Sequence, residues 1–137
     1  MRYVLDTNVV SEWMKGEARI VERLRSLQKQ DIAIPQSVVA EIAYGIERLP
    51  KSKRKERLED RLLAIQNEIQ RAAWTDEVSV SFGTIKATLE RRGERIEDFD
   101  AATAAHALAV GAILVTTNEK HMGRISGLRI EDWSAAK

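Results

Sequence analysis

The sequence predicts an α/β fold in which a mostly parallel sheet is covered by helices on both faces. Short apolar runs, typical of buried strands, alternate with longer segments whose apolar residues recur at helical spacing. Such alternation indicates parallel strands, because parallel neighbours need a crossover connection that is usually a helix. The chain of 137 residues has the usual size of a domain with one hydrophobic core. We therefore expect a single domain over residues 1–137.

The first half of the chain predicts two strands separated by helices. Residues 3–5 and 32–34 are short apolar runs, and Pro35 ends the second. Between them, apolar residues recur at helical spacing over residues 9–14 and 18–29.

Two further helices are expected before residue 74. Ser37 is the expected N-cap of an apolar helix that ends at Pro50. Residues 52–73 form a highly charged helical segment with heptad-like apolar spacing. Its apolar positions are Leu58, Leu62, Ile65, Ile69 and Ala72. This seam either packs against the domain's own core, which we expect, or serves dimerisation or partner docking.

The second half predicts three strands and three helices. The expected strands are residues 78–80, which are marginal, 112–116 and 128–130. The first expected helix contains Phe82, Ile85 and Leu89 and ends at Gly93. The second is alanine-rich and covers residues 101–110, and the third is a short helix after residue 117. Either Asp98 or Asp100 is the expected cap of the alanine-rich helix.

Composition excludes several classes of site and of protein. The chain has no cysteine, so disulfides and zinc–thiolate sites are excluded. It has only two histidines, His106 and His121, so a site with three histidine ligands is excluded as well. The net charge of +1 gives no argument for nucleic acid from charge alone. No apolar run is long enough for a membrane span or a signal peptide, and we expect a cytoplasmic protein.

Polar side chains recur where predicted strands end or helices begin. Asp6 follows the first strand, Glu41 lies in the helix after the second, and Asp100 lies at the start of the alanine-rich helix. Thr117 and Asn118 follow the strand at residues 112–116. Each has an ordinary interpretation as a helix cap or a solvent-facing residue. Because ligands collect at the carboxyl ends of parallel strands, we expect the group to converge on one site.

A site of this composition suits a hard cation. Carboxylate oxygens favour Mg²⁺ or Mn²⁺, and magnesium commonly joins carboxylates to substrate phosphates. The predicted chemistry is therefore phosphoryl transfer, in which the metal activates water and stabilises the leaving oxygen. Gly45, one helical turn after Glu41, suggests that another backbone approaches the glutamate closely.

Five segments, in order, resemble the PIN-domain family, specifically its VapC or FitB-like branch. They are residues 3–12 (YVLDTNVVSE), 39–46 (VAEIAYGI), 98–107 (DFDAATAAHA), 114–118 (LVTTN) and 122–125 (MGRI). The resemblance covers nearly the whole chain, and the motifs are specific through their order. It implies a PIN-like three-layer α/β/α sandwich.

The resemblance also implies a function and a set of site residues. It implies a metal-dependent endoribonuclease that is the toxin of a toxin–antitoxin pair, forms a homodimer, and is blocked by an antitoxin that binds operator DNA. Asp6, Glu41 and Asp100 match the positions that bind Mg²⁺ or Mn²⁺ in the family. Asn118 is the best match to a fourth catalytic position, and Glu119 is an alternative. Family members often have an acid where this chain has His121, which is a departure from the pattern.

Contacts with RNA are a separate expectation. The basic run at residues 51–55 either contacts backbone phosphate or, as we expect, is a solvated charged face. Trp13, Trp74 and Trp133 can stack on bases, but we expect them to pack in the core.

Two other functions compete with the ribonuclease. A haloacid-dehalogenase-like phosphatase also places an aspartate after its first strand, but it needs a second aspartate where this chain has Asn8, and a cap domain. A non-catalytic PIN-like module would act only with a DNA-binding partner. The three acids argue against that module, and His121 argues for it.

Overall fold

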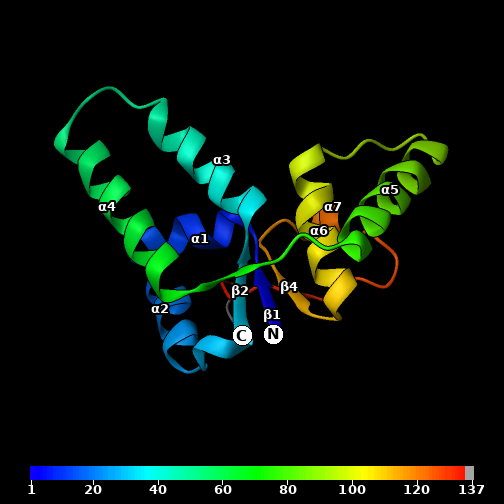
Figure 1. Ribbon diagram of the computed structural model, residues 1–137, viewed down its shortest axis with the longest axis horizontal. Helices are drawn as coiled ribbons and strands as arrows, with labels where there is room; N and C mark the ends of the chain where they lie inside the picture. Colours follow the sequence, from blue (N-terminus) through cyan, green and yellow to red (C-terminus); the bar gives the residue numbers. More distant parts are fainter. Residues whose placement is uncertain (135–137) are drawn as a thin grey trace.

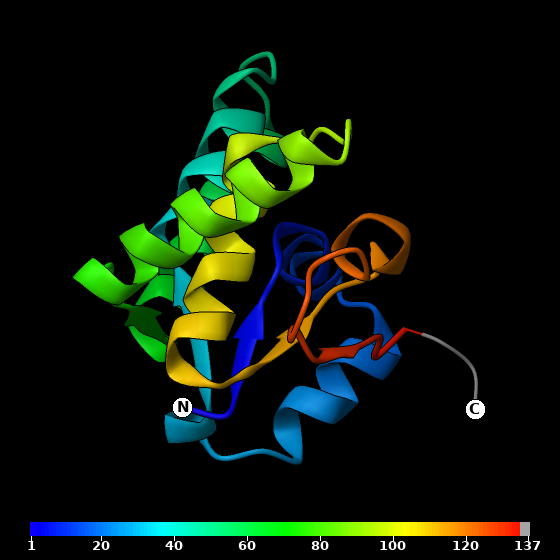
Figure 2. The ribbon, with the colours of Figure 1, turned by 90° about the vertical axis from the view of Figure 1, so that its right-hand side faces the viewer.

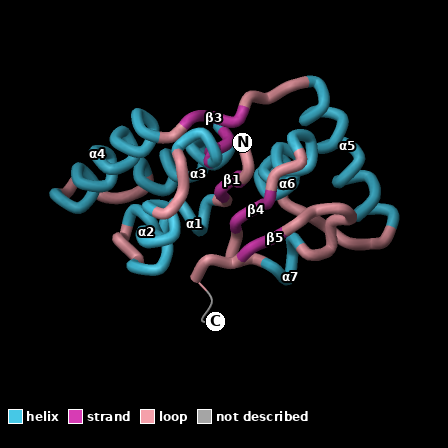
Figure 3. The backbone as a smooth tube through the Cα atoms, turned by 90° about the horizontal axis from the view of Figure 1, so that it is seen from below, coloured by secondary structure: helices cyan, strands magenta, loops and turns pink. Residues whose placement is uncertain are grey.

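The computed structural model describes residues 1–134 and has a five-stranded sheet between helices (Figures 1 and 3). The strands are β1 (Tyr3–Leu5), β2 (Ile32–Pro35), β3 (Gln70–Ala72), β4 (Ile113–Val115) and β5 (Ile130–Glu131). Their order is β3-β2-β1-β4-β5, and each neighbouring pair is parallel. The predicted α/β class and the three-layer arrangement are confirmed. Because β1 is central and the chain winds outward from it in both directions, the carboxyl end of β1 is the switch point where such folds bind ligands.

Two helical layers cover the two faces of the sheet. The helices of one layer are α1 (Thr7–Met14), α2 (Ala18–Arg25), α3 (Gln36–Glu47) and α4 (Lys53–Glu68). The other layer contains α5 (Asp76–Arg91), α6 (Asp98–Val110) and the short α7 (Glu119–Met122). Figure 2 shows α6 beside β1, with α5 on its outer side.

Successive side chains of β1 pack alternately into the cores on the two faces of the sheet. Tyr3 and Leu5 pack into the core beneath α1–α4, whereas Val4 packs into the core beneath α5 and α6. This is the two-residue period of a strand whose faces are both buried. All three side chains are at most 1% exposed, so the position of Asp6 after Leu5 is fixed by the core.

The heptad-like seam of α4 packs inward, as expected. Leu62, Ile65 and Ile69 are buried in the core of the α1–α4 layer, and Leu58 packs against it. The dimerisation or docking alternative is therefore not needed to explain the seam.

Two predicted helices end earlier than their periodicity indicated. The segment 18–29 is helical only to Arg25, and residues Lys29–Asp31 form a 3-10 turn. The segment 52–73 is helical to Glu68, and Gln70–Ala72 then form the edge strand β3. Only Ala72 of β3 is buried, so the strand has no apolar signal of its own. Its parallel pairing with β2 determines its conformation.

The marginal strand predicted at residues 78–80 is wrong. These residues lie in α5, where Val78 is buried and Val80 is 70% exposed. The helix begins at Asp76, and the Thr75 hydroxyl accepts a hydrogen bond from the Val78 N–H. Acidic residues in the first turn favour the helix through its dipole.

Two predicted caps are also wrong. Pro35 occupies the N-cap position of α3, and Ser37 lies inside the helix with a buried hydroxyl that has no hydrogen-bond partner among residues 1–134. Glu97 occupies the N-cap position of α6, so neither Asp98 nor Asp100 caps that helix. The end of α6 is as expected, because Gly111 has a φ of 68°, a left-handed conformation that glycine adopts without strain.

The remaining expectations differ in small ways. The strand predicted at residues 128–130 is Ile130–Glu131, and the one at 112–116 is Ile113–Val115. Trp133 is buried and Trp13 packs against the core, but Trp74 is 51% exposed, so the expectation of core packing is wrong for Trp74. Among the described helices, none combines the length and apolarity needed to cross a membrane.

Candidate active site

Asp6 lies at the carboxyl end of β1, and three donors fix the orientation of its carboxylate. Oδ1 accepts a hydrogen bond from the Thr7 N–H at 2.8 Å. Oδ2 accepts from the Thr116 hydroxyl at 2.8 Å and from the Asn8 amide at 3.2 Å. Asp6 is only 2% exposed, and burial raises its pKa despite these three hydrogen bonds. The residue caps α1, as one interpretation predicted, but it is also a buried acid with no ion-pair partner among the described residues.

Thr7 links Asp6 to Glu41. The Thr7 backbone N–H donates to Asp6, and its hydroxyl donates to Glu41 Oε1 at 2.8 Å. Glu41 is half-buried on α3, so the solvent-facing interpretation of this glutamate is wrong. Burial raises the pKa of Glu41, and the charges of Asp100 and Asp6 raise it further.

Asp100 completes the group of three acids from the first turn of α6. Burial raises its pKa, and the charge of Asp6 adds to the increase. His121 and Arg124, which lie in and after α7, act in the opposite direction on the pKa of Asp100. The pKa of Glu41 thus responds to the charges of Asp100 and Asp6, and the pKa of Asp100 to the charge of Asp6. The convergence of the three acids on one metal site stays a prediction.

Thr116 organises the β4 side of the site. Its hydroxyl donates to Asp6 and accepts hydrogen bonds from the Asn118 N–H at 3.0 Å and the Asn8 amide at 3.3 Å. The Asn8 side-chain oxygen accepts from the Thr117 N–H at 3.0 Å. The turn after β4 is thereby tied to the turn after β1.

Thr7, Asn8 and Thr116 are site residues that the sequence reasoning missed as such. Thr116 was predicted only as the end of a strand, and neither Thr7 nor Asn8 was assigned to the site. The available signal was the pair of hydrogen-bonding residues directly after Asp6. A buried carboxylate needs donors, and the two following residues are the nearest that can supply them.

Asn118, the expected fourth catalytic residue, makes fewer contacts with the site than the other polar residues. Asn118 is half-buried beside Thr116, but its side chain does not cap α7. Glu119 and His121 are exposed, and the charge of His121 acts to lower the pKa of Asp100. The described hydrogen bonds connect Asn118 to the site only through its backbone.

The expectation for Gly45 is wrong. A Cβ atom placed on Gly45 would meet no atom of another described segment within 4 Å, so no such backbone lies against the glycine on that side. The glycine instead faces open space beside Glu41.

The donor set of the site fits a hard divalent cation. Across residues 1–134, no group of three or more His, Asp or Glu side chains lies close enough together to hold a metal ion as placed. The three acids nevertheless carry raised pKa values and lack cationic partners within ion-pair distance among those residues. Three mutually repelling carboxylates of this kind are the arrangement that an oxygen-preferring cation stabilises.

Thr116→Val is expected to lower the free energy of unfolding by about 2 kcal/mol, because Asp6 loses a donor and the Asn118 N–H loses its acceptor. Thr103→Val is a matched control. Thr103 is equally buried, but its hydroxyl has no hydrogen-bond partner in the described part of the chain, so its removal is expected to be neutral or stabilising. Denaturant unfolding of both variants measures the difference. Equal effects would contradict the role given to Thr116.

Sequence comparison places the chain in a known family. The PIN domain family model matches residues 3–128. A tRNA(fMet)-specific endonuclease VapC of Shigella flexneri is 32% identical, over 98% of this chain and 99% of that protein. A ribonuclease VapC2 of Rickettsia felis is 34% identical, over 97% of this chain and 98% of that protein.

Solved structures agree with this assignment. VapBC2 from Rickettsia felis, bound to a DNA fragment from its promoter, has a chain that matches with a TM-score of 0.85, 31% identity and coverage of 97% of this chain and 99% of that one. A chain of the DNA-bound VapBC from Salmonella typhimurium matches with a TM-score of 0.87 and 29% identity. The match covers 97% of this chain and 98% of that one. Fold, order of motifs and sequence identity over nearly the full length lead to one conclusion: the chain belongs to the PIN-domain family.

Proposed function

We propose that this protein is a divalent-metal-dependent endoribonuclease and the toxin of a toxin–antitoxin pair, acting as a single PIN domain. The observation that carries the proposal is the buried, hydrogen-bonded Asp6 at the carboxyl end of β1, the switch point of the sheet, with Glu41 on α3 and Asp100 on α6 close enough for the charge of Asp6 to raise their pKa values. Membership of the PIN-domain family, and relatives named as ribonucleases along nearly the whole chain, support the same activity.

Asp6, Glu41 and Asp100 are the proposed ligands of the cation, and we propose Mg²⁺ or Mn²⁺ because all their donor atoms are carboxylate oxygens. A bound divalent ion activates water and stabilises negative charge on phosphoryl oxygens. The chain itself holds the ligands in place. Thr116 and the Thr7 N–H orient Asp6, and the Thr7 hydroxyl orients Glu41. The proposed role of Asn118 is to position the substrate or water on the β4 side.

The proposed partners follow from the relatives. The Rickettsia felis and Salmonella typhimurium proteins were solved as VapBC complexes on DNA. We propose that this chain forms a homodimer, binds a cognate antitoxin that blocks the site, and reaches operator DNA only through that antitoxin. RNA in the cytoplasm is the proposed substrate.

Growth and RNA ends test the proposal directly. Expression of the wild-type chain is expected to arrest growth and to create discrete new 5′ ends in total RNA. Glu41→Gln, which keeps the Thr7 hydrogen bond but removes a charge, is expected to give neither. Soluble wild-type protein without arrest or new ends would instead support the non-catalytic module.

A further inference from the structure

A groove of about 520 Å³ borders the proposed active site between α1, α3 and α4. Thr7 and Glu41 belong to its lining, so the groove and the site share two residues. Its volume lies in the range of roughly 300–1,000 Å³ that is typical of ligand pockets. The three helices that form it lie together in one layer (Figure 1).

The floor of the groove is apolar and open. Its apolar residues are Met14, Ile42, Ile46, Leu49 and Leu58. Gly45 belongs to the same lining, and the space above it is free of protein atoms within 4 Å of a Cβ position. The absence of a side chain at Gly45 therefore keeps this part of the groove open.

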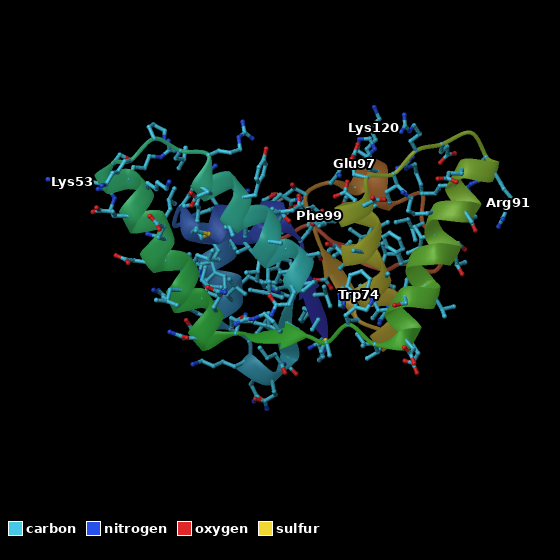
Figure 4. The ribbon with its side chains drawn as sticks, turned by 45° about the horizontal axis from the view of Figure 1, so that its top comes forward. Lys53, Trp74, Arg91, Glu97, Phe99 and Lys120 are labelled. Carbon is cyan, nitrogen blue, oxygen red and sulfur yellow. The ribbon has the colours of Figure 1, made fainter. Side chains whose placement is uncertain are left out.

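The remaining polar lining is strongly basic. The Lys15 ammonium nitrogen lies 3.8 Å from a carboxylate oxygen of Glu12, and the Arg61 guanidinium donates a hydrogen bond to the carbonyl oxygen of Met14. Arg54 and Arg57 are exposed, and in the described part of the chain neither makes a hydrogen bond or an ion pair. They lie in the first turns of α4, whose first residue, Lys53, is labelled at the tip in Figure 4.

These features complement a nucleotide. A guanidinium group presents donors in the planar arrangement that suits phosphate, and an apolar floor accepts the face of a base. The carboxylates of the site repel a phosphodiester, so positive charge beside them is needed to admit a polyanion. Arg54 and Arg57 supply such charge from the chain itself.

We infer that this groove binds the RNA strand next to the cleavage point, with Arg54 and Arg57 as positioning residues that contact backbone phosphate. The inference rests on the proposed ribonuclease function. An acidic amphipathic peptide would also find an apolar floor and a basic rim. RNA is favoured because Thr7 and Glu41 line the groove, and a strand that is cut beside Glu41 must pass through the adjoining space.

The test compares RNA binding by variants of the full chain. The probe is a fluorescent single-stranded RNA that contains a cleavage site mapped with the wild-type protein, and an Asp6→Asn background prevents its cleavage. Arg54→Gln combined with Arg57→Gln is expected to weaken binding roughly tenfold. The slope of log affinity against log salt should fall by about 0.7 for each arginine.

Arg25→Gln is the matched control for charge. Arg25 is exposed at the end of α2 and lies outside the groove, so the loss of one arginine charge there should alter neither affinity nor slope. In the cleaving background, the arginine variants should raise KM with little change in kcat, which is the signature of lost substrate binding.

Gly45→Leu tests the groove independently of charge. Leucine has a higher helix propensity than glycine, and its Cβ meets no protein atom, so the unfolding temperature should not fall. The side chain would occupy the groove, and RNA binding should weaken about tenfold if the strand lies there.

Two results would overturn the inference while leaving the ribonuclease function intact. One is cleavage and RNA affinity equal to wild type in both the arginine and the Gly45→Leu variants. The other is unchanged RNA affinity with lost binding to the cognate antitoxin, which would assign the groove to a protein partner. A wild-type chain that neither cleaves nor binds RNA would instead overturn the proposed function, and the inference with it.

Discussion

Asp6→Asn is expected to abolish RNA cleavage without unfolding the protein. Asp6 is the most buried of the three acids, and the substitution removes the charge that a divalent cation requires. Loss of an outer-sphere partner in a metal site typically lowers affinity or activity by about 10- to 100-fold. Loss of Asp6, a proposed direct ligand, should therefore reduce kcat/KM by more than about 100-fold.

Opposing effects should keep the stability of Asp6→Asn near that of the wild type. The asparagine cannot satisfy all three donors that surround Asp6, which costs about 1 kcal/mol. It also removes a buried charge, which is favourable when no cation is bound. Cleavage of a defined RNA and thermal unfolding in chelator, measured on the same preparation, separate the two effects.

Asp98→Asn is the matched control for that experiment. Asp98 lies two residues before Asp100, but its side chain is 74% exposed and pairs with Lys86. The same chemical change there should leave cleavage within about twofold, since an exposed ion pair contributes little. Retained cleavage by Asp6→Asn would remove Asp6 from the catalytic group.

Divalent cations are expected to raise the unfolding temperature, and to raise it more at neutral than at acidic pH. At a concentration about 100 times the dissociation constant, binding adds about 2.7 kcal/mol to the free energy of unfolding. For a chain of this length, that corresponds to an increase of about 10 °C. Mg²⁺ and Mn²⁺ titrations against a chelator reference measure the increase, with no need for RNA.

The pH dependence follows from the direction of the pKa shifts. Burial raises the pKa values of Asp6, Glu41 and Asp100 in the folded chain. Between the ordinary and the raised values, the folded chain holds more protons than the unfolded chain. The stability from these groups is therefore greatest below the ordinary pKa values and is lost as pH rises through the raised ones. A cation offsets that loss, so its stabilising effect should grow as pH rises.

Asp100→Asn should reduce the increase in unfolding temperature that divalent cations cause, whereas Asp98→Asn should leave that increase unchanged. An increase that is the same in wild type and in Asp100→Asn would show that cations bind elsewhere on the protein.

The sequence determined the class of the fold because its core strands have patterns that local physics can interpret. The apolar runs at residues 3–5, 32–34 and 114–115 are buried, so helices had to cover both faces of the sheet. The same pattern placed Asp6 at a strand end. The order of motifs then indicated Glu41 and Asp100 as its companions.

The elements that sequence reasoning missed are those with weak local signals. Edge strand β3 has one buried residue and continues the heptad spacing of α4, so only its pairing with β2 distinguishes it from helix. Residues 78–80 alternate like a strand, but the Thr75 cap and the packing of α5 on α6 make them helical. In both cases, contacts between distant segments outweighed a short periodic pattern.

The sequence pattern predicts on which elements the three acids lie, but the surroundings of those acids depend on the assembled fold. Thr7 joins Asp6 to Glu41, Thr116 joins the turns after β1 and β4, and Gly45 opens onto a groove rather than onto another backbone. Hydrogen bonds and burial depend on atoms that are more than 30 residues apart in the chain and adjacent in space. Periodicity reports only local structure, so these relations appear only when the sheet is assembled.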